Sequence, residues 1–337
     1  MASKEDYIAA VAATAARLDG VLKKRFLQAI EDLRDKVDWR QIAEWLEQGR
    51  PDLVMGVFST ELLNSGYAGF GAGLTEAFIV GGTMAASFVP PFVDNTTGAE
   101  IRVIFNVANP ALAQVTHQYQ ISTITQISNE TRQTIQQILQ DGVTNGINPR
   151  QTARQIRQYI GLTPHQLNAV QNYRRMLENK PVEALNNQLR DRRFDRTVTA
   201  AELKQHSLPK ATIDKMVDRY AERYLNYRAE MIARTESIRA LNMSNYQLWQ
   251  NMIDEGRVSE SRIRRFWLSG EDGRTRPAHK RKGGIPSLND KGVGMKEPFK
   301  SAYGPILYPC QPGADPRNVI HCRCAVFTRL VGDRADD

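Results

Sequence analysis

Apolar residues recur three and four positions apart through the first fifty residues of the chain, which is the spacing of amphipathic helices. The recurring positions within residues 5–49 are Ile8, Val11, Leu18, Val21, Leu22, Phe26, Ile30, Leu33, Val37, Ile42 and Leu46. This pattern predicts one or two helices. We expect them to end at Arg50-Pro51-Asp52, because proline interrupts the hydrogen bonds of a helix interior.

A second apolar stretch, residues 66–93, combines many glycines with very little charge. Its glycines are Gly66, Gly69, Gly71, Gly73, Gly81 and Gly82, and Glu76 is the one charged residue between Gly69 and Val93. The length would suit a membrane span, but the glycines and the central glutamate disfavour a stable one. We predict small-residue helices that pack closely within the core or against another subunit, with a transient membrane contact during delivery as the alternative. No Gly-Lys-Ser/Thr follows, so the glycines do not form a phosphate loop.

The chain between residues 101 and 250 is predicted to be helical after one short strand. The strand is indicated by the loose alternation of Ile101–Asn106. The turn residues Asn145-Gly-Ile-Asn-Pro149 then separate two helical patterns. The predicted helices cover about residues 110–141, 151–160, 166–177, 181–189 and 210–249.

Past Gly256 the composition changes, with frequent glycine and proline and only short apolar runs. This predicts a compact α+β module that begins with the long helix and ends with a strand at Val319–Thr328. The fold class is therefore mainly α, with a helical N-terminal body and a small C-terminal α+β module. The expected parts are a helical body at 1–150, a basic helical region at 151–225, the module at 226–330 and a tail at 331–337.

The overall composition, with 41% apolar and 24% charged residues, is that of a folded soluble protein. The start, Met1-Ala-Ser-Lys-Glu-Asp, has no basic segment followed by an apolar one, so we expect a protein made and kept in the cytoplasm. Three cysteines cannot all pair with one another. Reduced thiols, available to a metal, are expected rather than a disulfide framework.

The net charge of +8 is concentrated in the second half of the chain, because residues 151–240 carry 17 Lys and Arg against 10 Asp and Glu. Such a surplus favours contacts with DNA or RNA phosphates that do not depend on sequence. The alternative is a solvated helical surface that happens to be rich in arginine. The DNA-facing candidates lie in the basic helices between Arg150 and Arg239 and are Arg174, Arg175, Arg192, Arg193 and Arg196.

The three cysteines and one histidine of the module form a candidate zinc site. Cys322 and Cys324 would point to the same face of a strand, with His321 and Arg323 on the other face. His279 and Cys310 could complete a tetrahedral Cys3His site, in which His279, Cys322 and Cys324 are the favoured ligands. The alternative is that Cys322 and Cys324 are small buried core residues, a common role for free cysteine.

The loop from Asp272 to His279 is polar and rich in arginine, which suits either phosphodiester chemistry or structural bracing. We favour bracing, since no second carboxylate and base at helical spacing complete a catalytic set. In that interpretation the helix and the loop form a structural clasp. Its residues are Arg234, Glu236, Asp272, Arg274 and Arg276. The competing hypothesis is a metal-dependent nuclease built on Asp272, His279 and His321.

Several of these residues occur in an order that resembles the phage Mu protein F-type minor head proteins. The shared elements, within roughly residues 225–328, are Ile232-Ala-Arg-Thr-Glu236, Ala240, Asn242, Trp267, Asp272-x-Arg-x-Arg276, His279, Pro309 and Val319-Ile-His-Cys-Arg-Cys324. Relatives usually have Asn-Cys-Arg-Cys at the end, whereas this chain has His321 in place of the asparagine. The cysteine pair is kept, and only a role for the preceding side chain is put in doubt.

The resemblance implies a protein of the virion, present in few copies inside the head near the portal after assembly in the host cytoplasm. It implies contacts with the portal or major capsid protein and with packaged DNA, in head morphogenesis and in DNA packaging or ejection. Association with further copies of the chain is a further expectation. The resemblance implies no enzyme activity, so the alternatives are the nuclease above and a nucleic-acid-binding module unrelated to virions.

Overall fold

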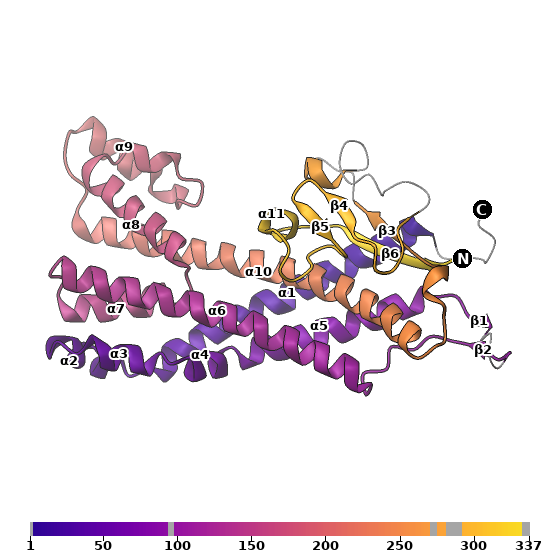
Figure 1. Ribbon diagram of the computed structural model, residues 1–337. Helices are drawn as coiled ribbons and strands as arrows, with labels where there is room; N and C mark the ends of the chain where they lie inside the picture. Colours follow the sequence, from indigo (N-terminus) through magenta and orange to yellow (C-terminus); the bar gives the residue numbers. More distant parts are fainter. Residues whose placement is uncertain (1–2, 94–97, 270–274, 281–291, 332–337) are drawn as a thin grey trace. The chain divides into compact units, whose positions relative to one another are not determined.

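The computed structural model describes residues 3–93, 98–269, 275–280 and 292–331. Its helices confirm the predicted fold class, mainly α with a small α+β region near the C-terminus (Figure 1). The α-helices are α1 Lys4–Lys36, α2 Trp39–Glu47, α3 Pro51–Val57, α4 Thr60–Gly66, α5 Ala68–Ser87, α6 Pro110–Thr144, α7 Pro149–Tyr159, α8 Pro164–Asn179, α9 Asp195–Leu203, α10 Lys210–Asp254 and α11 Pro316–Val319.

Short 3-10 helices and strands fill the remaining connections. The 3-10 helices are η1 Glu183–Asn186, η2 Arg192–Phe194, η3 Glu260–Arg262 and η4 Pro277–His279. The strands are β1 Phe92–Val93, β2 Glu100–Ile101, β3 Ile263–Leu268, β4 Phe299–Ser301, β5 Gly304–Ile306 and β6 Ala325–Leu330. They pair as antiparallel two-stranded sheets, β1 with β2, β3 with β6, and β4 with β5.

The chain divides into two compact units that are discontinuous in sequence. Unit 1 contains residues 1–25, 70–121 and 230–337, and unit 2 contains residues 26–69 and 122–229. The consecutive ranges 1–150, 151–225, 226–330 and 331–337 stay a prediction.

Unit 2 is a set of helices whose apolar faces form the core. Phe26 on α1 stacks on Tyr67, with ring centroids 5.9 Å apart, and the Tyr67 hydroxyl shares a hydrogen bond of 3.0 Å with Thr131. The side chain of Arg228 on α10 is also buried, paired with Glu130 at 2.6 Å, and its guanidinium donates to the Gly161 carbonyl. Burial of this cation is tolerated because both partners are in place.

In unit 1 the glycine-rich helix α5 packs closely on α10, as one of the predicted alternatives required. A Cβ built on Gly81 would lie 2.5 Å from Ser244 Oγ and 2.9 Å from Leu241 Cα. Only glycine allows this approach of the two helices without a shift of the backbone. Among the described residues no helix is both long enough and apolar enough to cross a bilayer.

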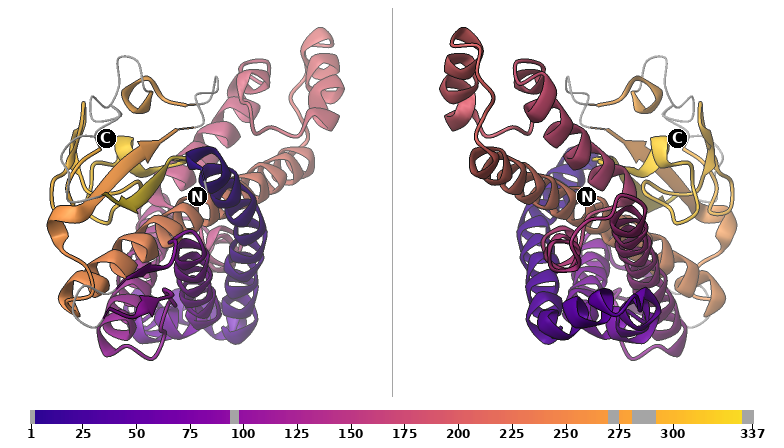
Figure 2. Two further views of the ribbon diagram at one scale, coloured as in Figure 1. Left: turned by 90° about the vertical axis from the view of Figure 1, so that its right-hand side faces the viewer. Right: turned by 90° about the vertical axis from the view of Figure 1, so that its left-hand side faces the viewer.

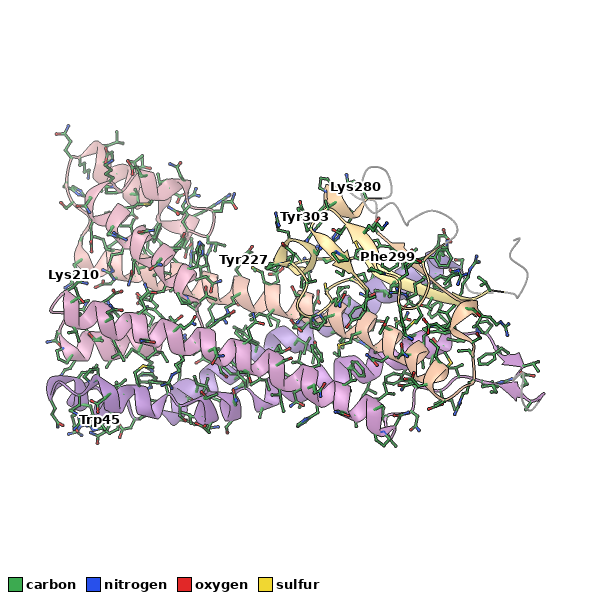
Figure 3. The ribbon with its side chains drawn as sticks, viewed as in Figure 1. Trp45, Lys210, Tyr227, Lys280, Phe299 and Tyr303 are labelled. Atoms are coloured by element: carbon green, nitrogen blue, oxygen red, sulfur yellow. The ribbon has the colours of Figure 1, made fainter. Side chains whose placement is uncertain are left out.

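The strands of the C-terminal region lie beside the second half of α10, as the views in Figures 1 and 2 show. In the register of β3 and β6, Phe266 lies opposite Phe327 and Trp267 opposite Val326. Figure 3 labels Phe299 and Tyr303, which belong to the β4–β5 hairpin of the same region, and Lys210, where α10 begins.

Four local predictions need correction. The expected break before Pro51 exists, but Pro51 itself opens α3, because the first helical position does not need the missing N–H. The strand predicted at Ile101–Asn106 reduces to Glu100–Ile101. The helix predicted at 181–189 is the short 3-10 helix η1, while α9 had not been predicted. The strand predicted at Val319–Thr328 begins only at Ala325, because the proline at Pro316 opens α11 and a turn follows it.

Candidate metal centre

The cysteine pair lies in the turn between α11 and β6, not in a strand. Asp315 caps α11 by accepting a hydrogen bond from the Arg317 backbone N–H at 2.8 Å. The turn then passes through His321, whose φ of 57° is in the left-handed region. Residues other than glycine rarely adopt this backbone conformation, so hydrogen bonds from neighbouring elements are needed to stabilise the turn.

A polar face of α10 holds the backbone around the cysteines. Asn242 donates to the Cys324 carbonyl at 3.1 Å and accepts from the Val326 N–H at 2.7 Å. Asn245 donates to the Val326 carbonyl at 3.0 Å. Strand β6 pairs with β3 along one edge, so these asparagines satisfy groups on the other edge that would otherwise be buried without partners.

One and two turns earlier, the same face of α10 fixes two further segments. Thr235 accepts from the His321 N–H at 3.3 Å, and Arg239 donates to the Cys310 carbonyl at 2.8 Å. Arg239 is paired with the buried Glu236 at 2.6 Å, which also accepts from the Tyr119 hydroxyl at 2.8 Å. Burial, followed by the Glu236 charge, raises the pKa of Tyr119 well above its usual value. The Ala-Arg-Thr-Glu helix thus positions the cysteines through backbone contacts.

His279 ends the 3-10 helix η4 with its ring buried against Trp267, at a centroid distance of 5.1 Å and an angle of 72°. Its Nε2 is 3.1 Å from the Oδ1 of the buried Asn318. The orientation of this amide follows from its other contact, in which Nδ2 donates to the Tyr303 carbonyl at 3.3 Å. His279 Nε2 is therefore the protonated nitrogen, and Nδ1 is left with a lone pair.

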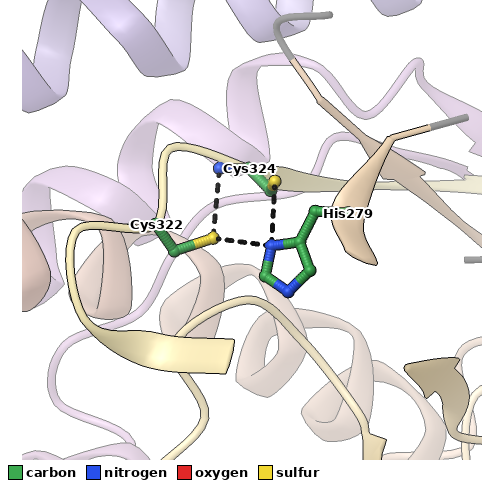
Figure 4. Close-up of side chains that lie close together, drawn as sticks. All are labelled: His279, Cys322 and Cys324. Atoms are coloured by element: carbon green, nitrogen blue, oxygen red, sulfur yellow. Dashed lines mark hydrogen bonds between the residues drawn. The ribbon is translucent and has the colours of Figure 1, made fainter. Parts of the chain in front are cut away.

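That lone pair points at both thiols of the cysteine pair (Figure 4). His279 Nδ1 lies 3.5 Å from Cys322 Sγ and 3.6 Å from Cys324 Sγ. The three potential ligand atoms all lie within 4.8 Å of one another, and the three residues are buried. The Cys324 backbone N–H also points at Cys322 Sγ, at 3.5 Å. Two sulfurs and one imidazole nitrogen form a donor set that suits zinc, whereas magnesium prefers oxygen.

The thiols differ in their acidity. Hydrogen bonds from Cys310 and Cys324 hold the pKa of the Cys322 thiol well below its usual range. Burial raises the pKa of Cys310, and the hydrogen bond to Cys322 raises that of Cys324.

Cys310, the fourth residue of the predicted site, lies next to the other three but outside their close group. It is fully buried, with φ at 62°, and its thiol donates to the Val319 carbonyl at 3.3 Å. Its carbonyl is the one held by Arg239.

The predicted clasp residues of α10 form ion pairs with neighbouring side chains. Arg234 pairs with Asp19 of α1 at 3.6 Å, and Glu236 pairs with Arg239. The Arg276 guanidinium donates to the carbonyls of Arg317 and Ile320, so this arginine braces the turn before the cysteines. Asp272 and Arg274 lie outside the described residues, and so does the carboxylate of the nuclease hypothesis. Among the residues that the structure describes, no carboxylate joins the His279 group.

The five predicted DNA-facing arginines, all in unit 2, fall into two kinds. Arg174 is paired with Asp214 at 2.6 Å, Arg193 with Asp191 at 2.5 Å, and Arg175 donates to Asn172. Arg192 and Arg196 are exposed, and no partner is found for either within the described part of the chain.

A cationic groove in unit 2 contains basic residues that sequence reasoning did not single out. Residues of α1, α7 and α10 line its volume of about 710 Å³. Arg154, Arg157 and Lys215 lie at its wall, exposed, with no ion-pair partner among the described residues. The other two cations of its wall, Arg34 and Arg219, are paired with Glu31 and Glu222. Helical spacing of Arg154 and Arg157 was the available signal.

Comparison with known proteins supports the resemblance found in the sequence. A family model described as Phage Mu protein F like protein matches residues 133–327, more than half of the chain and more than the region first recognised. No curated protein and no solved structure gives a significant match. The match includes the α10 face, the cysteine pair and His279. The chain therefore belongs to the Phage Mu protein F like family and is a phage head morphogenesis protein.

Proposed function

We propose that this protein is built into the phage head near the portal, where it contacts packaged DNA and acts in DNA packaging or ejection. The role is structural and requires no catalytic residue. We expect the portal or major capsid protein to be its protein partner. We also expect it to bind further copies of its own chain. Membership of a head protein family supports the virion location.

The cationic groove of unit 2 is the observation that supports DNA contact. Arg154, Arg157 and Lys215 make no ion pair with a described carboxylate, although Asp218 also lines the groove, so their charges are available to phosphates. Arg174 and Arg193 already have carboxylate partners, and a phosphate would have to compete for them. Arg192 and Arg196 add two more available cations outside the groove. Contacts of this kind bind the DNA backbone without reading its sequence.

A salt titration of double-stranded DNA binding tests this part of the proposal. Each phosphate contact contributes about 0.9 to the slope of log affinity against log salt. The slope is negative, and in the triple variant Arg154→Gln, Arg157→Gln, Lys215→Gln its absolute value should therefore be smaller by roughly 3. A matched variant with three exposed cations of unit 1 replaced, Arg17→Gln, Lys24→Gln and Lys300→Gln, should keep the wild-type slope. Equal slopes in all three proteins would remove the groove from the proposal.

The location near the portal needs intact particles. Mass spectrometry of purified heads should detect the protein, and cryo-EM without imposed icosahedral symmetry should place it inside the head at the portal vertex. Absence from the particle, or a position only in the tail, would contradict the proposal. Retention of the groove variant in heads that package normally but eject DNA poorly would assign the contact to ejection.

A further inference from the structure

The His279, Cys322 and Cys324 group has no part in the head role argued above. Its three ligand-type atoms converge in the buried interior of unit 1, where DNA and the portal protein have no access. We propose that these residues, with Cys310 as fourth ligand, bind one zinc ion in a closed tetrahedral site that fixes the C-terminal module. The proposal does not depend on the location of the protein in the virion.

The two nitrogen–sulfur distances match those of a zinc tetrahedron. With Zn–S bonds of about 2.3 Å and a Zn–N bond of about 2.0–2.1 Å at tetrahedral angles, sulfur and nitrogen ligands lie about 3.6 Å apart. The separations of His279 Nδ1 from Cys322 Sγ and Cys324 Sγ are 3.5 and 3.6 Å. Hydrogen bonding alone explains this less well, because one imidazole lone pair cannot accept two thiol hydrogens with good geometry. A metal ion between the three atoms accounts for both distances.

The contacts around His279 are those of a metal ligand. Its Nε2–H donates to Asn318, which fixes the tautomer that presents Nδ1 to the sulfurs. Asn318 is itself held by Tyr303 and Ser301 and is buried. Histidines that bind zinc are oriented in this way, by a hydrogen bond from the other ring nitrogen. On the sulfur side, the Cys324 N–H to Cys322 Sγ contact would stabilise a bound thiolate.

Cys310 is the described residue that can close the site. Its side chain interacts with that of Cys322, and Arg239 holds its carbonyl at the point where its backbone is left-handed. Rotation about its Cα–Cβ bond, away from the Val319 carbonyl, would turn the thiolate toward the other three ligands. A small cavity of about 20 Å³ beside His321 and Arg276 offers the alternative, a water molecule in the fourth position.

Metal analysis of the purified wild-type protein, kept reduced, gives the first test. We expect one zinc per chain, and none after Cys322→Ser or Cys324→Ser. Cobalt substitution should give thiolate charge-transfer bands, and these should weaken in Cys310→Ser. The positioning variant Asn318→Ala should bind zinc about 10–100-fold more weakly while keeping the same ligands. The exposed His165→Asn on α8 should behave as wild type.

Alkylation of the wild-type thiols makes the test independent of how well the variants fold. With zinc bound, Cys310, Cys322 and Cys324 should react slowly, and a chelator should make them reactive while lowering the melting temperature. Wild-type protein that takes up neither zinc nor cobalt under reducing conditions would overturn the site. An unchanged cobalt spectrum in Cys310→Ser would overturn the closed arrangement and give the fourth position to water. A Cys322–Cys324 disulfide in freshly purified protein would also contradict the proposal.

Discussion

The helices of unit 2 and the strands and turns of the C-terminal module are stabilised in different ways. In unit 2 the helices satisfy most of their own backbone, side chains such as Arg228 hold the helix ends, and apolar side chains such as Leu167 and Ile156 fill the core. In the module, buried polar side chains satisfy backbone groups that short strands leave unpaired, as Asn242 and Arg265 do. Unit 2 should therefore tolerate an apolar core substitution that changes the shape of a side chain better than one that introduces a polar group. In the module, both kinds of substitution at buried positions should be destabilising.

The largest effect is expected at Arg265 of β3. Its buried guanidinium donates to the carbonyls of Gly294, Glu297 and Leu307. Arg265→Met leaves all three without a donor and should cost about 3–5 kcal/mol. Arg265→Lys keeps the charge but lacks the planar fork, so it should recover only part of this. Urea unfolding with hydrogen exchange should locate the loss in the module.

The neighbouring Arg264 supplies the control for this prediction. It lies on the same strand, half-buried, and donates to the carbonyls of Ser261 and Ile263. Arg264→Met should cost less than about 1 kcal/mol, since Ser261 is exposed and Ile263 keeps its pairing with Leu330 in the β3–β6 sheet. Equal losses in the two variants would mean that the buried contacts of Arg265 carry no special weight.

The converse change belongs to unit 2, at the fully buried Leu167 of α8. Leu167→Ala should cost about 3 kcal/mol through the lost apolar contacts and the cavity. Leu167→Met keeps the volume and should cost less than about 1.5 kcal/mol. Chemical denaturation of the three proteins checks this, and a methionine variant as unstable as the alanine one would show a core as exacting as the module.

In the module, a swap that conserves volume should not be tolerated. Asn242→Leu keeps the size of the side chain but leaves the Cys324 carbonyl and the Val326 N–H without partners. A cost of about 2 kcal/mol is expected, with faster hydrogen exchange at Val326. Asn226, exposed on the same helix, is the matched control, and Asn226→Leu should change the unfolding free energy by about 0.5 kcal/mol or less.

The same contrast explains what the sequence could predict. The helices of unit 2 and the long α10 follow from apolar residues at helical spacing, because the period alone defines their buried face. The residue types of His279, Cys322 and Cys324 indicated a metal site, and the structure brings them together, although bound metal stays a prediction. The roles of Asn242, Asn245 and Asn318 could not be predicted. An asparagine on a helix or in a loop does not show in the sequence which distant backbone group it will satisfy.

The strand predicted at Val319–Thr328 is wrong in its first half for the same reason, contacts with segments far away in the sequence. Its apolar residues suggested strand pairing over its whole length, but only Ala325–Leu330 finds a partner strand. The part before it is shaped by Thr235, Arg276 and the left-handed backbone of His321. Such contacts between distant segments override local propensity. The cysteines therefore converge on His279 from a turn, although the prediction placed them on a strand.

The smallest effect on stability is expected at Asp191, a buried carboxylate of unit 2. Like the polar groups of the module, it accepts a hydrogen bond from a backbone N–H. Asp191 accepts from the Arg193 side chain and backbone, which lowers the pKa of its carboxyl to about 2. The unfolded value is about 3.9, so the folded state binds the proton more weakly. The stabilisation is thus complete at neutral pH and is lost as the pH falls from about 5 through 2. Because the Arg193 side chain is 73% exposed, solvent screening should reduce it to about 1 kcal/mol.

Asp191→Asn tests this assignment through the pH dependence of unfolding. The variant should be less stable than wild type by about 1 kcal/mol at pH 7. The difference should shrink as the pH falls and vanish only below pH 2, where the Asp191 carboxyl of the wild-type protein is largely protonated. Asp35→Asn, at an exposed carboxylate of α1 with no described partner, should follow the wild-type curve at every pH. A gap between Asp191→Asn and wild type that does not shrink between pH 7 and pH 2 would assign the loss to the geometry of the η2 cap and not to the charge. The stability of this cap would then come from a hydrogen bond to the backbone and not from the carboxylate charge. That is also how Asn242 stabilises the module.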